Sequence, residues 1–461
     1  MVSVEELEQV VGRDWVITRG DQIEAYLADQ TPVPVRPPAA QHVVVVKPAS
    51  AEEISQVFKL ANKDGTPVYP RGGGTGICGG TVPVKGGIVL SLERLDQIEE
   101  VDRDNLMVVA QGGVTLADLL RAVEAGDLLF PPHPGDEGAQ IGGLVACNAG
   151  GTRAVKYGVV RNYVKGLEVV LPTGEIVHMG GKLLKNNTGL DLMHLMVNSG
   201  GILGIITKVI LRLYPRFAAT ATLIASWDDR HTAIRAVPQI LRSGVIPLAL
   251  EYVERDVIQI SCDYLGLNWP VNKGTAHLIV IVSGSSEDDV YTQAETVSDV
   301  CQKSGAVDIL MAERREEQAE ILKIRSEMYS ALKANVADVM DIAVPPAEIA
   351  NYLDAVDAIA EKYNTRIPTY GHAGDGNLHP HVMRDTVERG VTDAVKKEVY
   401  MAGLRMGGII TAEHGVGRTK LDTLDYSLDA KSQDLMRGIK KLFDPHNILN
   451  PGAVVGGDAG V

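Results

Sequence analysis

Residues 71–80 read Arg-Gly-Gly-Gly-Thr-Gly-Ile-Cys-Gly-Gly, a glycine-rich loop from which the rest of the fold can be predicted outward along the chain. It follows an apolar stretch at residues 67–69 that predicts a β-strand. Consecutive glycines leave backbone N–H groups free to point toward one anion. A pyrophosphate is the ligand that such a loop would be expected to bind. The spacing matches neither a P-loop nor the Rossmann fingerprint. Taken alone, the loop is explained equally well by a plain glycine-rich turn.

The sequence around the loop predicts two domains. Residues 42–46 predict a buried strand, and Ser50 with Glu53 forms a capping-box pattern that opens a helix to about residue 63. Short strands are expected at residues 87–92, 107–110, 164–171 and 204–213. After Pro215 the elements lengthen, with a strand at 276–282 and helices at 288–305 and about 314–333. This predicts a mixed α/β first domain and an α+β second domain.

The composition and the net charge limit the class of protein to which the chain can belong. The 461 residues are 45% hydrophobic and 22% charged, which predicts a globular chain of two or three domains. A formal net charge of −15 without any basic run argues against nucleic acid as a partner. We expect no membrane span and a cytoplasmic location, because apolar runs are short and the N-terminus is acidic. The four cysteines form no Cys-x-x-Cys pair, so electrons moved by this protein would need a separate acceptor.

A second set of small residues lies at positions 131–136, 141–151 and 156–158. Glycines this dense mark places where backbone lies against a large flat ligand. Together with residues 171–175 and 203–207, these segments resemble the FAD-binding domain of the vanillyl-alcohol-oxidase-type flavoproteins. The similarity is strongest to the branch that holds the large flavin subunit of glycolate oxidase, D-lactate dehydrogenases and D-2-hydroxyglutarate dehydrogenases. It runs from about residue 36 to Gly452.

The resemblance implies an α+β fold with two domains. A p-cresol-methylhydroxylase-type (PCMH-type) FAD-binding domain is expected at residues 36–215, after an N-terminal helical segment at 1–35. A substrate and metal-binding cap domain with an antiparallel sheet is expected at 216–445, and a tail at 446–461 that returns to the FAD-binding domain.

The resemblance also implies FAD as the cofactor. Thr75 stands where covalent members of the superfamily place a histidine, so we expect noncovalent binding. Residues 198–202 read Asn-Ser-Gly-Gly-Ile where the family usually has Gly-Ser-Glu-Gly-Thr, so contacts of that Glu or Thr are not carried over. The expected FAD-binding residues are Arg71, Gly72, Gly73, Gly74, Thr75, Gly76, Gly79, Pro134, Gly135, Asp136, Ile141, Gly142, Cys147, Asn148, Gly151, Tyr157, Gly158, Ile205, Ile206 and Asn450.

Histidines gather in two glycine-rich stretches near the C-terminus. His372, His379 and His381 lie in one stretch, and Glu413 with His414 lies in another. Imidazole nitrogens with one carboxylate suit zinc, manganese or iron(II). A single histidine here is best explained as a surface or hydrogen-bonded residue, but the combined pattern favours a metal.

The resemblance assigns a role to each of these residues. It implies His372, His379 and Glu413 as metal ligands and His414 as the base, while His381 is either a fourth ligand or a substrate contact. In extended backbone, neighbouring side chains point in opposite directions, so Glu413 would face the metal and His414 the substrate.

Arg325 stands where the family's Leu-Trp-x-x-Arg motif places an arginine that binds the substrate carboxylate. A planar guanidinium suits that role, although an arginine on a charged helix often only faces solvent. Leu322 replaces the motif's tryptophan, which suggests a remodelled pocket. Val339 and Met340 stand where relatives that use dicarboxylates have a lysine, which favours lactate or glycolate over 2-hydroxyglutarate.

The expected function is FAD- and metal-dependent oxidation of a small D-2-hydroxy acid to the 2-oxo acid. Electrons would leave to a protein partner, either an electron-transferring flavoprotein or an iron–sulfur subunit, and a homodimer is also considered. Two alternatives stay open: an alcohol or sugar oxidase on the same fold, and a flavin-carrying electron-transfer subunit without a substrate of its own.

Overall fold

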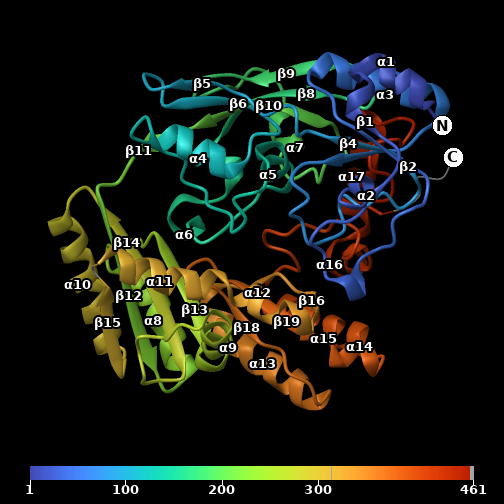
Figure 1. The fold of residues 1–461 in the computed structure, drawn as a ribbon. Helices are drawn as coiled ribbons and strands as arrows, with labels where there is room; N and C mark the ends of the chain where they lie inside the picture. Colours follow the sequence, from blue (N-terminus) through green and yellow to red (C-terminus); the bar gives the residue numbers. More distant parts are fainter. Residues whose placement is uncertain (313, 457–461) are drawn as a thin grey trace.

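The computed structural model describes residues 1–312 and 314–456, which form two lobes (Figure 1). The first lobe holds a four-stranded sheet in the order β1-β2-β4-β3, in which β2 and β3 run parallel to β4. Its strands are β1 (Val16–Ile17), β2 (Val43–Val46), β3 (Val68–Arg71) and β4 (Gly87–Ser91). The glycine-rich loop therefore begins at the carboxyl end of β3.

Helix α3 (Ala51–Asp64) joins β2 to β3 and begins where the capping pattern predicts. The Ser50 side chain accepts a hydrogen bond from the Glu53 N–H at 3.2 Å, which satisfies one of the free donors at the helix start. Ile54 and Phe58 on its inner face are fully buried in the core of this sheet. Helix α1 (Val4–Val11) packs against α3, and β1 pairs with β2, so residues 1–35 also build this lobe.

A second, antiparallel sheet completes the first lobe in the order β5-β6-β10-β8-β9. Helix α5 (Ile141–Cys147) packs against β10, and β7 pairs with β11. The strands are β5 (Ile98–Asp102), β6 (Met107–Gln111), β7 (Leu128–Leu129), β8 (Val164–Val170), β9 (Ile176–Gly180), β10 (Ile205–Arg212) and β11 (Tyr214–Pro215). The other helices are α2 (Asp21–Glu24), α4 (Leu116–Glu124), α6 (Ala154–Tyr157) and α7 (Met193–Met196).

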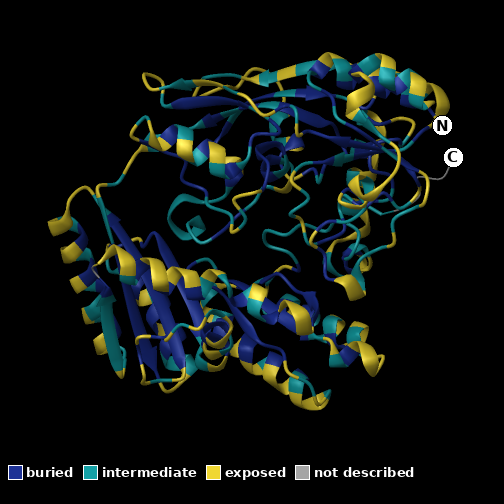
Figure 2. Ribbon diagram, in the orientation of Figure 1, coloured by how far each residue is buried: buried dark blue, intermediate teal, exposed yellow. Residues whose placement is uncertain are grey.

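The second lobe is built on one large antiparallel sheet in the order β15-β12-β14-β13-β18-β19-β16. Figure 2 shows the central strands of this sheet buried, the edge strand β15 mostly of intermediate exposure, and the outer faces of the helices exposed. The strands are β12 (Ala219–Trp227), β13 (Ala249–Glu254), β14 (Ala276–Gly284), β15 (Asp308–Ala312), β16 (Val336–Val339), β17 (Ile342–Ala343), β18 (Thr369–His372) and β19 (Asn377–Met383). The helices are α8 (Arg230–Arg242), α9 (Arg255–Leu265), α10 (Glu287–Lys303), α13 (Ile349–Lys362), α14 (Asp385–Glu388) and α15 (Thr392–Arg405).

The single helix predicted near residues 314–333 is wrong. The structure has two helices, α11 (Arg315–Ser326) and α12 (Met328–Leu332), with Glu327 between them at ψ 4°. The break lets Met328 and Leu332 enter the same buried cluster as Ile324, which packing favours over one straight helix.

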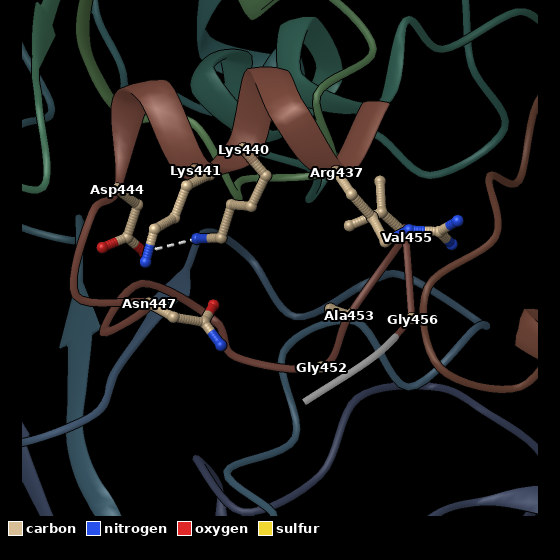
Figure 3. A pocket seen from close by; sticks show the side chains of 9 residues that line it. All are labelled: Arg437, Lys440, Lys441, Asp444, Asn447, Gly452, Ala453, Val455 and Gly456. Carbon is tan, nitrogen blue, oxygen red and sulfur yellow. Dashed lines mark hydrogen bonds and ion pairs between the residues drawn. The ribbon is translucent and has the colours of Figure 1, made fainter. Parts of the chain in front are cut away.

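The chain returns to the first lobe after α16 (Leu424–Ser427) and α17 (Ala430–Phe443), shown in red in Figure 1. The buried Lys440 ammonium pairs with Asp444, and both residues line the pocket shown in Figure 3. Lys440 also donates to the carbonyls of Ile202 and Leu449. Leu449 forms a parallel bridge with Val68 of β3. A cavity of about 50 Å³ lies between α17 and residues 452–456. The last residues of the expected tail, 457–461, lie outside the described residues.

Within the described residues, no helix is both long and apolar enough to cross a bilayer. The cytoplasmic location stays a prediction, as do the domain boundaries at residues 35, 215 and 445.

Candidate active site between the lobes

The glycine-rich loop offers a row of free backbone donors. Among the described residues, the N–H groups of residues 73–78 donate no backbone hydrogen bond, and Gly73 and Gly76 are exposed. Successive free N–H groups in a glycine-rich loop can form a concave site for an anion. A Cβ on Gly73 would lie 2.5 Å from the Gly138 carbonyl oxygen, so the loop packs directly on the second glycine-rich segment. These features fit the pyrophosphate of FAD.

Three predicted flavin-binding segments meet at this point. The Gly142 N–H donates to the Gly112 carbonyl at 2.8 Å, and a Cβ on Gly142 would lie 3.1 Å from the Ile206 carbonyl oxygen. Farther along, a Cβ on Gly151 would lie 2.3 Å from the His133 carbonyl oxygen. The residues on the joined segments are Gly72, Gly73, Gly74, Thr75, Gly76, Gly79, Pro134, Gly135, Asp136, Ile141, Gly142, Cys147, Asn148, Gly151, Ile205 and Ile206.

Two other predicted flavin-binding residues, Arg71 and Asn450, use their side chains to bind backbone groups around the loop. Arg71 donates to the carbonyls of Ala25 and Ala28 at 2.7 and 2.8 Å, which fixes the N-terminal segment beside the loop. Asn450 donates to the Gly80 carbonyl at 2.9 Å and accepts from Arg418 at 2.5 Å. These side chains are turned toward the protein.

Tyr157 and Gly158 stand at the end of α6. The Tyr157 carbonyl accepts from the Tyr163 hydroxyl at 2.7 Å. A Cβ on Gly158 would lie 2.6 Å from the Asn162 side-chain oxygen, so this turn is closely packed.

Three imidazoles converge on one carboxylate oxygen in the second lobe. The Oε1 atom of Glu413 lies 3.6 Å from His372 Nε2, 3.5 Å from His379 Nε2 and 3.8 Å from His414 Nε2. Tetrahedral ligands with bonds of about 2.1 Å are about 3.4 Å apart, so these separations suit a bound zinc-like ion. Among the described residues, the four whose possible ligand atoms all lie within 4.8 Å of one another are Asp341, His379, Glu413 and His414. His414 is therefore a candidate ligand as well as the predicted base, and the predicted ligand His372 approaches this group through Glu413.

The hairpin of β18 and β19 brings His372 and His379 together. Gly371 pairs with Leu378, and the turn at Gly376 has φ +85°, a conformation that glycine adopts at little cost. Side chains alternate along each strand, so both histidines project from the same face of the pair. Their ring centroids are 5.4 Å apart.

Asp341 shapes the backbone that carries Glu413 and His414. Its Oδ2 atom accepts hydrogen bonds from the N–H groups of Ala412, Glu413 and His414 at 2.8 to 2.9 Å. Three consecutive N–H groups can meet one oxygen only if the backbone curves. The predicted extended backbone is therefore wrong, and Glu413 and His414 do not point in opposite directions.

Asp341 also lies within ligand distance of His379, Glu413 and His414, so it has to be considered as a ligand itself. Its second oxygen, Oδ1, accepts from the Asn377 amide at 2.8 Å. Because both oxygens already accept hydrogen bonds and the residue is fully buried, we assign Asp341 to support of the loop.

Glu251 of β13 connects the histidine cluster to Arg325. Its Oε1 atom lies 2.7 Å from His372 Nδ1, and its Oε2 atom accepts from Arg325 Nη2 at 2.5 Å. The guanidinium of Arg325 stands over the Tyr370 ring, 4.8 Å from its centroid. The predicted carboxylate-binding arginine is thus held beside the cluster, whereas Leu322 one helical turn earlier is 40% exposed.

His381 takes no part in the cluster. The residue is fully buried, its Nδ1 atom lies 3.1 Å from the Pro368 carbonyl, and its Nε2 atom lies 3.3 Å from the Tyr370 hydroxyl. Burial lowers the pKa of His381 to about 4. With both ring nitrogens engaged, it supports Tyr370, and neither alternative predicted for it describes its position.

Burial and neighbouring charges shift the pKa values of the residues in the cluster in opposite directions. Burial alone would lower the pKa of His372, but the adjacent carboxylates of Glu251 and Glu413 outweigh it and raise that pKa well above its ordinary value. Burial would raise the pKa of Glu413, yet its contact with His372 and the neighbouring imidazoles lower it to about 2. Burial, together with His414, lowers the pKa of His379 well below its ordinary value, so His379 is a neutral imidazole. A neutral imidazole and an ionised carboxylate are the forms that bind metal.

Two functional residues, Glu251 and Asp341, escaped prediction from the sequence. Each is a single acidic residue inside an apolar strand-like run, between Leu250 and Tyr252 and between Met340 and Ile342. An acidic residue is rarely buried unless it is paired, so this placement was the available signal.

The cluster lies where the two lobes meet. A Cβ on Gly150 of the first lobe would lie 2.5 Å from Glu413 Oε2, and one on Gly374 would lie 2.5 Å from the Val155 side chain. The Cys78 thiol in the glycine-rich loop lies 3.3 Å from the Gly415 carbonyl oxygen. The anion-binding loop and the histidine cluster therefore border one interlobe site.

A dinucleotide-binding lobe joined to a lobe with a histidine and carboxylate cluster defines a two-lobed flavin-dependent oxidoreductase. Two family models match the chain: an FAD binding domain at residues 43–180, and the C-terminal domain of FAD linked oxidases at residues 217–454. The chain belongs to the FAD-linked oxidase family, which confirms the predicted family and FAD as its cofactor.

Curated relatives cover nearly the whole chain. It is 42% identical to D-lactate dehydrogenase of Archaeoglobus fulgidus, over 94% of this chain and 96% of that protein. It is 38% identical to the glycolate oxidase subunit GlcD of Bacillus subtilis, over 90% of this chain and 89% of that protein.

Solved structures share the fold. The chain aligns with p-cresol methylhydroxylase at a TM-score of 0.79 and 17% identity, over 98% of this chain and 96% of that one. It aligns with 4-ethylphenol oxidase from Gulosibacter chungangensis at a TM-score of 0.78 and 20% identity, over 99% and 98%. This likeness confirms the predicted PCMH-type fold.

Proposed function

We propose that the protein oxidises a small D-2-hydroxy acid, D-lactate or glycolate, to the 2-oxo acid. The observation that carries the proposal is the convergence of His372, His379 and His414 on Glu413 Oε1 at 3.5 to 3.8 Å, beside Gly150 of the flavin lobe. The relatives named D-lactate dehydrogenase and glycolate oxidase subunit GlcD support the same substrate class.

Each residue of the site has a separate role in binding the substrate or in accepting its proton. Arg325 binds the substrate carboxylate, since its guanidinium is held in place by Glu251 and Tyr370. His372, His379 and Glu413 would hold a divalent metal, which would supply Lewis-acid chemistry that lowers the pKa of the substrate hydroxyl. His414 accepts the hydroxyl proton at a ring nitrogen. FAD would be held along the glycine-rich loop and would supply the acceptor for the hydride.

Val339 and Met340, which stand where relatives that use dicarboxylates have a lysine, favour a monocarboxylate. Val339 and Met340 are buried, at 6% and 0% exposure, directly before Asp341. They offer no positive charge to a second carboxylate, whose burial without a partner would cost several kcal/mol. D-Lactate and glycolate avoid that cost, and D-2-hydroxyglutarate does not.

Electrons leave the flavin to another protein. The cysteines Cys78, Cys147, Cys262 and Cys301 are all free, so they offer no cluster that could store electrons. An electron-transferring flavoprotein or an iron–sulfur subunit would serve as the acceptor, as the subunit name of the Bacillus subtilis relative suggests.

The direct test is anaerobic reduction of the bound flavin. D-Lactate, L-lactate, glycolate and D-2-hydroxyglutarate are each added to protein of known flavin and metal content, and bleaching of the flavin absorbance is followed. We expect bleaching by D-lactate or glycolate, its loss after chelation, and its return when metal is restored. Flavin that stays oxidised with every acid, in protein that holds both cofactors, would overturn the proposal and favour an electron-transfer subunit.

The base assignment has its own test. His414→Ala should retain FAD and metal yet lose flavin reduction by at least a hundredfold, since general-base catalysis contributes about 10² to 10⁴. His231→Ala is the control, because His231 pairs with Asp354 on the outer surface of the second lobe. Wild-type reduction rates in His414→Ala would refute the role.

A further inference from the structure

Glu251 is a buried carboxylate with two partners of different function. The residue is 2% exposed and lies in β13 between the buried side chains of Leu250 and Tyr252. One oxygen binds the imidazole of His372 at 2.7 Å and the other binds the guanidinium of Arg325 at 2.5 Å. A single side chain thus joins a predicted metal ligand to the predicted substrate arginine.

The strand register explains the first contact. Tyr252 of β13 pairs with Gly371 of β18 in antiparallel fashion, so the next pair along the ladder is Glu251 and His372. Directly opposed side chains have Cβ atoms about 5 Å apart, which allows a short hydrogen bond. The second contact comes from the last turn of α11, where Arg325 reaches down onto the sheet.

Stability alone does not account for this arrangement. Burying a charged group costs several kcal/mol, and a buried ion pair is often no more stabilising than apolar side chains of the same volume. The side chains that share the face of Glu251, Ala249 and Val253 along β13 and Ile279 opposite, are apolar and buried, so a charge is not needed to fill this layer of the core.

We propose that Glu251 is a positioning residue that sets the metal ligand His372 and the carboxylate-binding Arg325 in one fixed relation. Because Glu251 Oε1 lies 2.7 Å from His372 Nδ1, it fixes which ring nitrogen faces Glu413, and Nε2 is the nitrogen that would meet a bound metal. Because Glu251 also holds Nη2 of Arg325 over the Tyr370 ring, the rest of the guanidinium is presented in one orientation. The inference rests on the proposed function for Arg325 but not for the metal contact.

The test uses Glu251→Gln, which keeps the shape and removes the charge. An amide offers one acceptor oxygen and one NH2 donor group, so it can accept a hydrogen bond from His372 Nδ1–H or from Arg325 but not through two oxygens from both. Glu254→Gln is the matched control: it lies three residues along the same strand and pairs with Tyr252 and Arg230. Flavin absorbance and the thermal midpoint of each variant establish that it is folded.

Metal binding is measured first, without substrate. Metal-free protein is titrated with Zn²⁺ or Mn²⁺ against a coloured chelator. We expect Glu251→Gln to lose ten- to a hundredfold in affinity, the usual effect of removing a carboxylate behind a metal-binding histidine. Glu254→Gln should stay within threefold of wild type. Equal affinities in Glu251→Gln and wild type would overturn the metal half of the inference.

Substrate binding is measured second, at saturating metal. The concentration of D-lactate or glycolate that half-reduces the flavin should rise at least tenfold in Glu251→Gln and not in Glu254→Gln. An unchanged value would overturn the arginine half. If no acid reduces the wild-type flavin, the proposed function fails, while the metal titration still decides on Glu251. If Glu251→Gln does not fold, Glu251→Asp keeps the charge but is too short for both partners, and wild-type values in both assays would refute the inference.

Discussion

A buried histidine far from the cluster makes stability of the second lobe depend on pH. His277 of β14 is fully buried, its ring stands edge-on to Trp269, and neither ring nitrogen has a partner among the described residues. Burial, with the nearby charge of Arg255, lowers its pKa from 6.5 to about 4. We therefore expect His277→Leu to change how the free energy of unfolding varies with pH.

The sign follows from proton binding. Between pH 6.5 and pH 4 the unfolded chain binds a proton at this histidine and the folded chain does not. The folded state is therefore favoured fully above pH 6.5, and this contribution is lost as the pH falls toward 4. A pKa difference of this size corresponds to about 3 kcal/mol in total, of which about 2 kcal/mol is lost by pH 5.

The assay is urea unfolding at pH 8 and pH 5, followed by the fluorescence of Trp227 and Trp269, which both lie in the second lobe. His277→Leu should be at least as stable as wild type at pH 8, because it removes two unpaired polar atoms. Its advantage should grow by about 2 kcal/mol at pH 5. His277→Gln should show the same growth from a lower starting value. A difference from wild type that is equal at both pH values would refute the reasoning.

Three further outcomes are expected. Gly73→Ala places a Cβ 2.5 Å from the Gly138 carbonyl oxygen and should weaken FAD binding at least tenfold in a flavin fluorescence titration, whereas Gly80→Ala meets open space and should not. Lys440→Met leaves Asp444 buried without its cation and should lower the free energy of unfolding by about 3 to 5 kcal/mol. The double variant Lys440→Met with Asp444→Asn should recover part of this loss, because the amide removes the charge and keeps an acceptor for the N–H groups of Ile448 and Leu449. Arg325→Lys keeps the charge but loses the planar fork, so the substrate concentration for half-maximal flavin reduction should rise at least tenfold while FAD and metal contents stay unchanged.

Local patterns in the sequence predicted the parts of the fold that depend on neighbours in the chain. The helix after Ser50 begins where the capping pattern predicts, because capping is decided within four residues. The glycine-rich loop was recognisable because its composition alone frees the backbone donors. The break at Glu327 was not, because the packing of Met328 and Leu332 that causes it involves distant strands.

In the candidate site, too, the sequence predicted the features that depend on nearby residues and missed those that depend on tertiary contacts. The stretch with His372 and His379 pointed to a hairpin metal site because its histidines and glycines are close in sequence. Asp341 binds the backbone of residues 412–414, and Glu251 binds His372, across separations that no local pattern reports. The curved backbone at Glu413 depends on Asp341, so the predicted extended geometry could not be corrected without the tertiary contact.

The return of the chain to β3 has a consequence for biosynthesis. The Val68 N–H donates to the Ile448 carbonyl at 2.8 Å, and the Asn450 N–H donates to the Val68 carbonyl at 2.7 Å, so an early strand is bordered by a late segment. A ribosome releases β3 long before it makes Leu449, and during that interval the strand has an open edge. The hydrogen bonds that close this edge of β3 can form only after the whole second lobe has been translated, so the last part of the flavin lobe to be completed depends on the end of the chain.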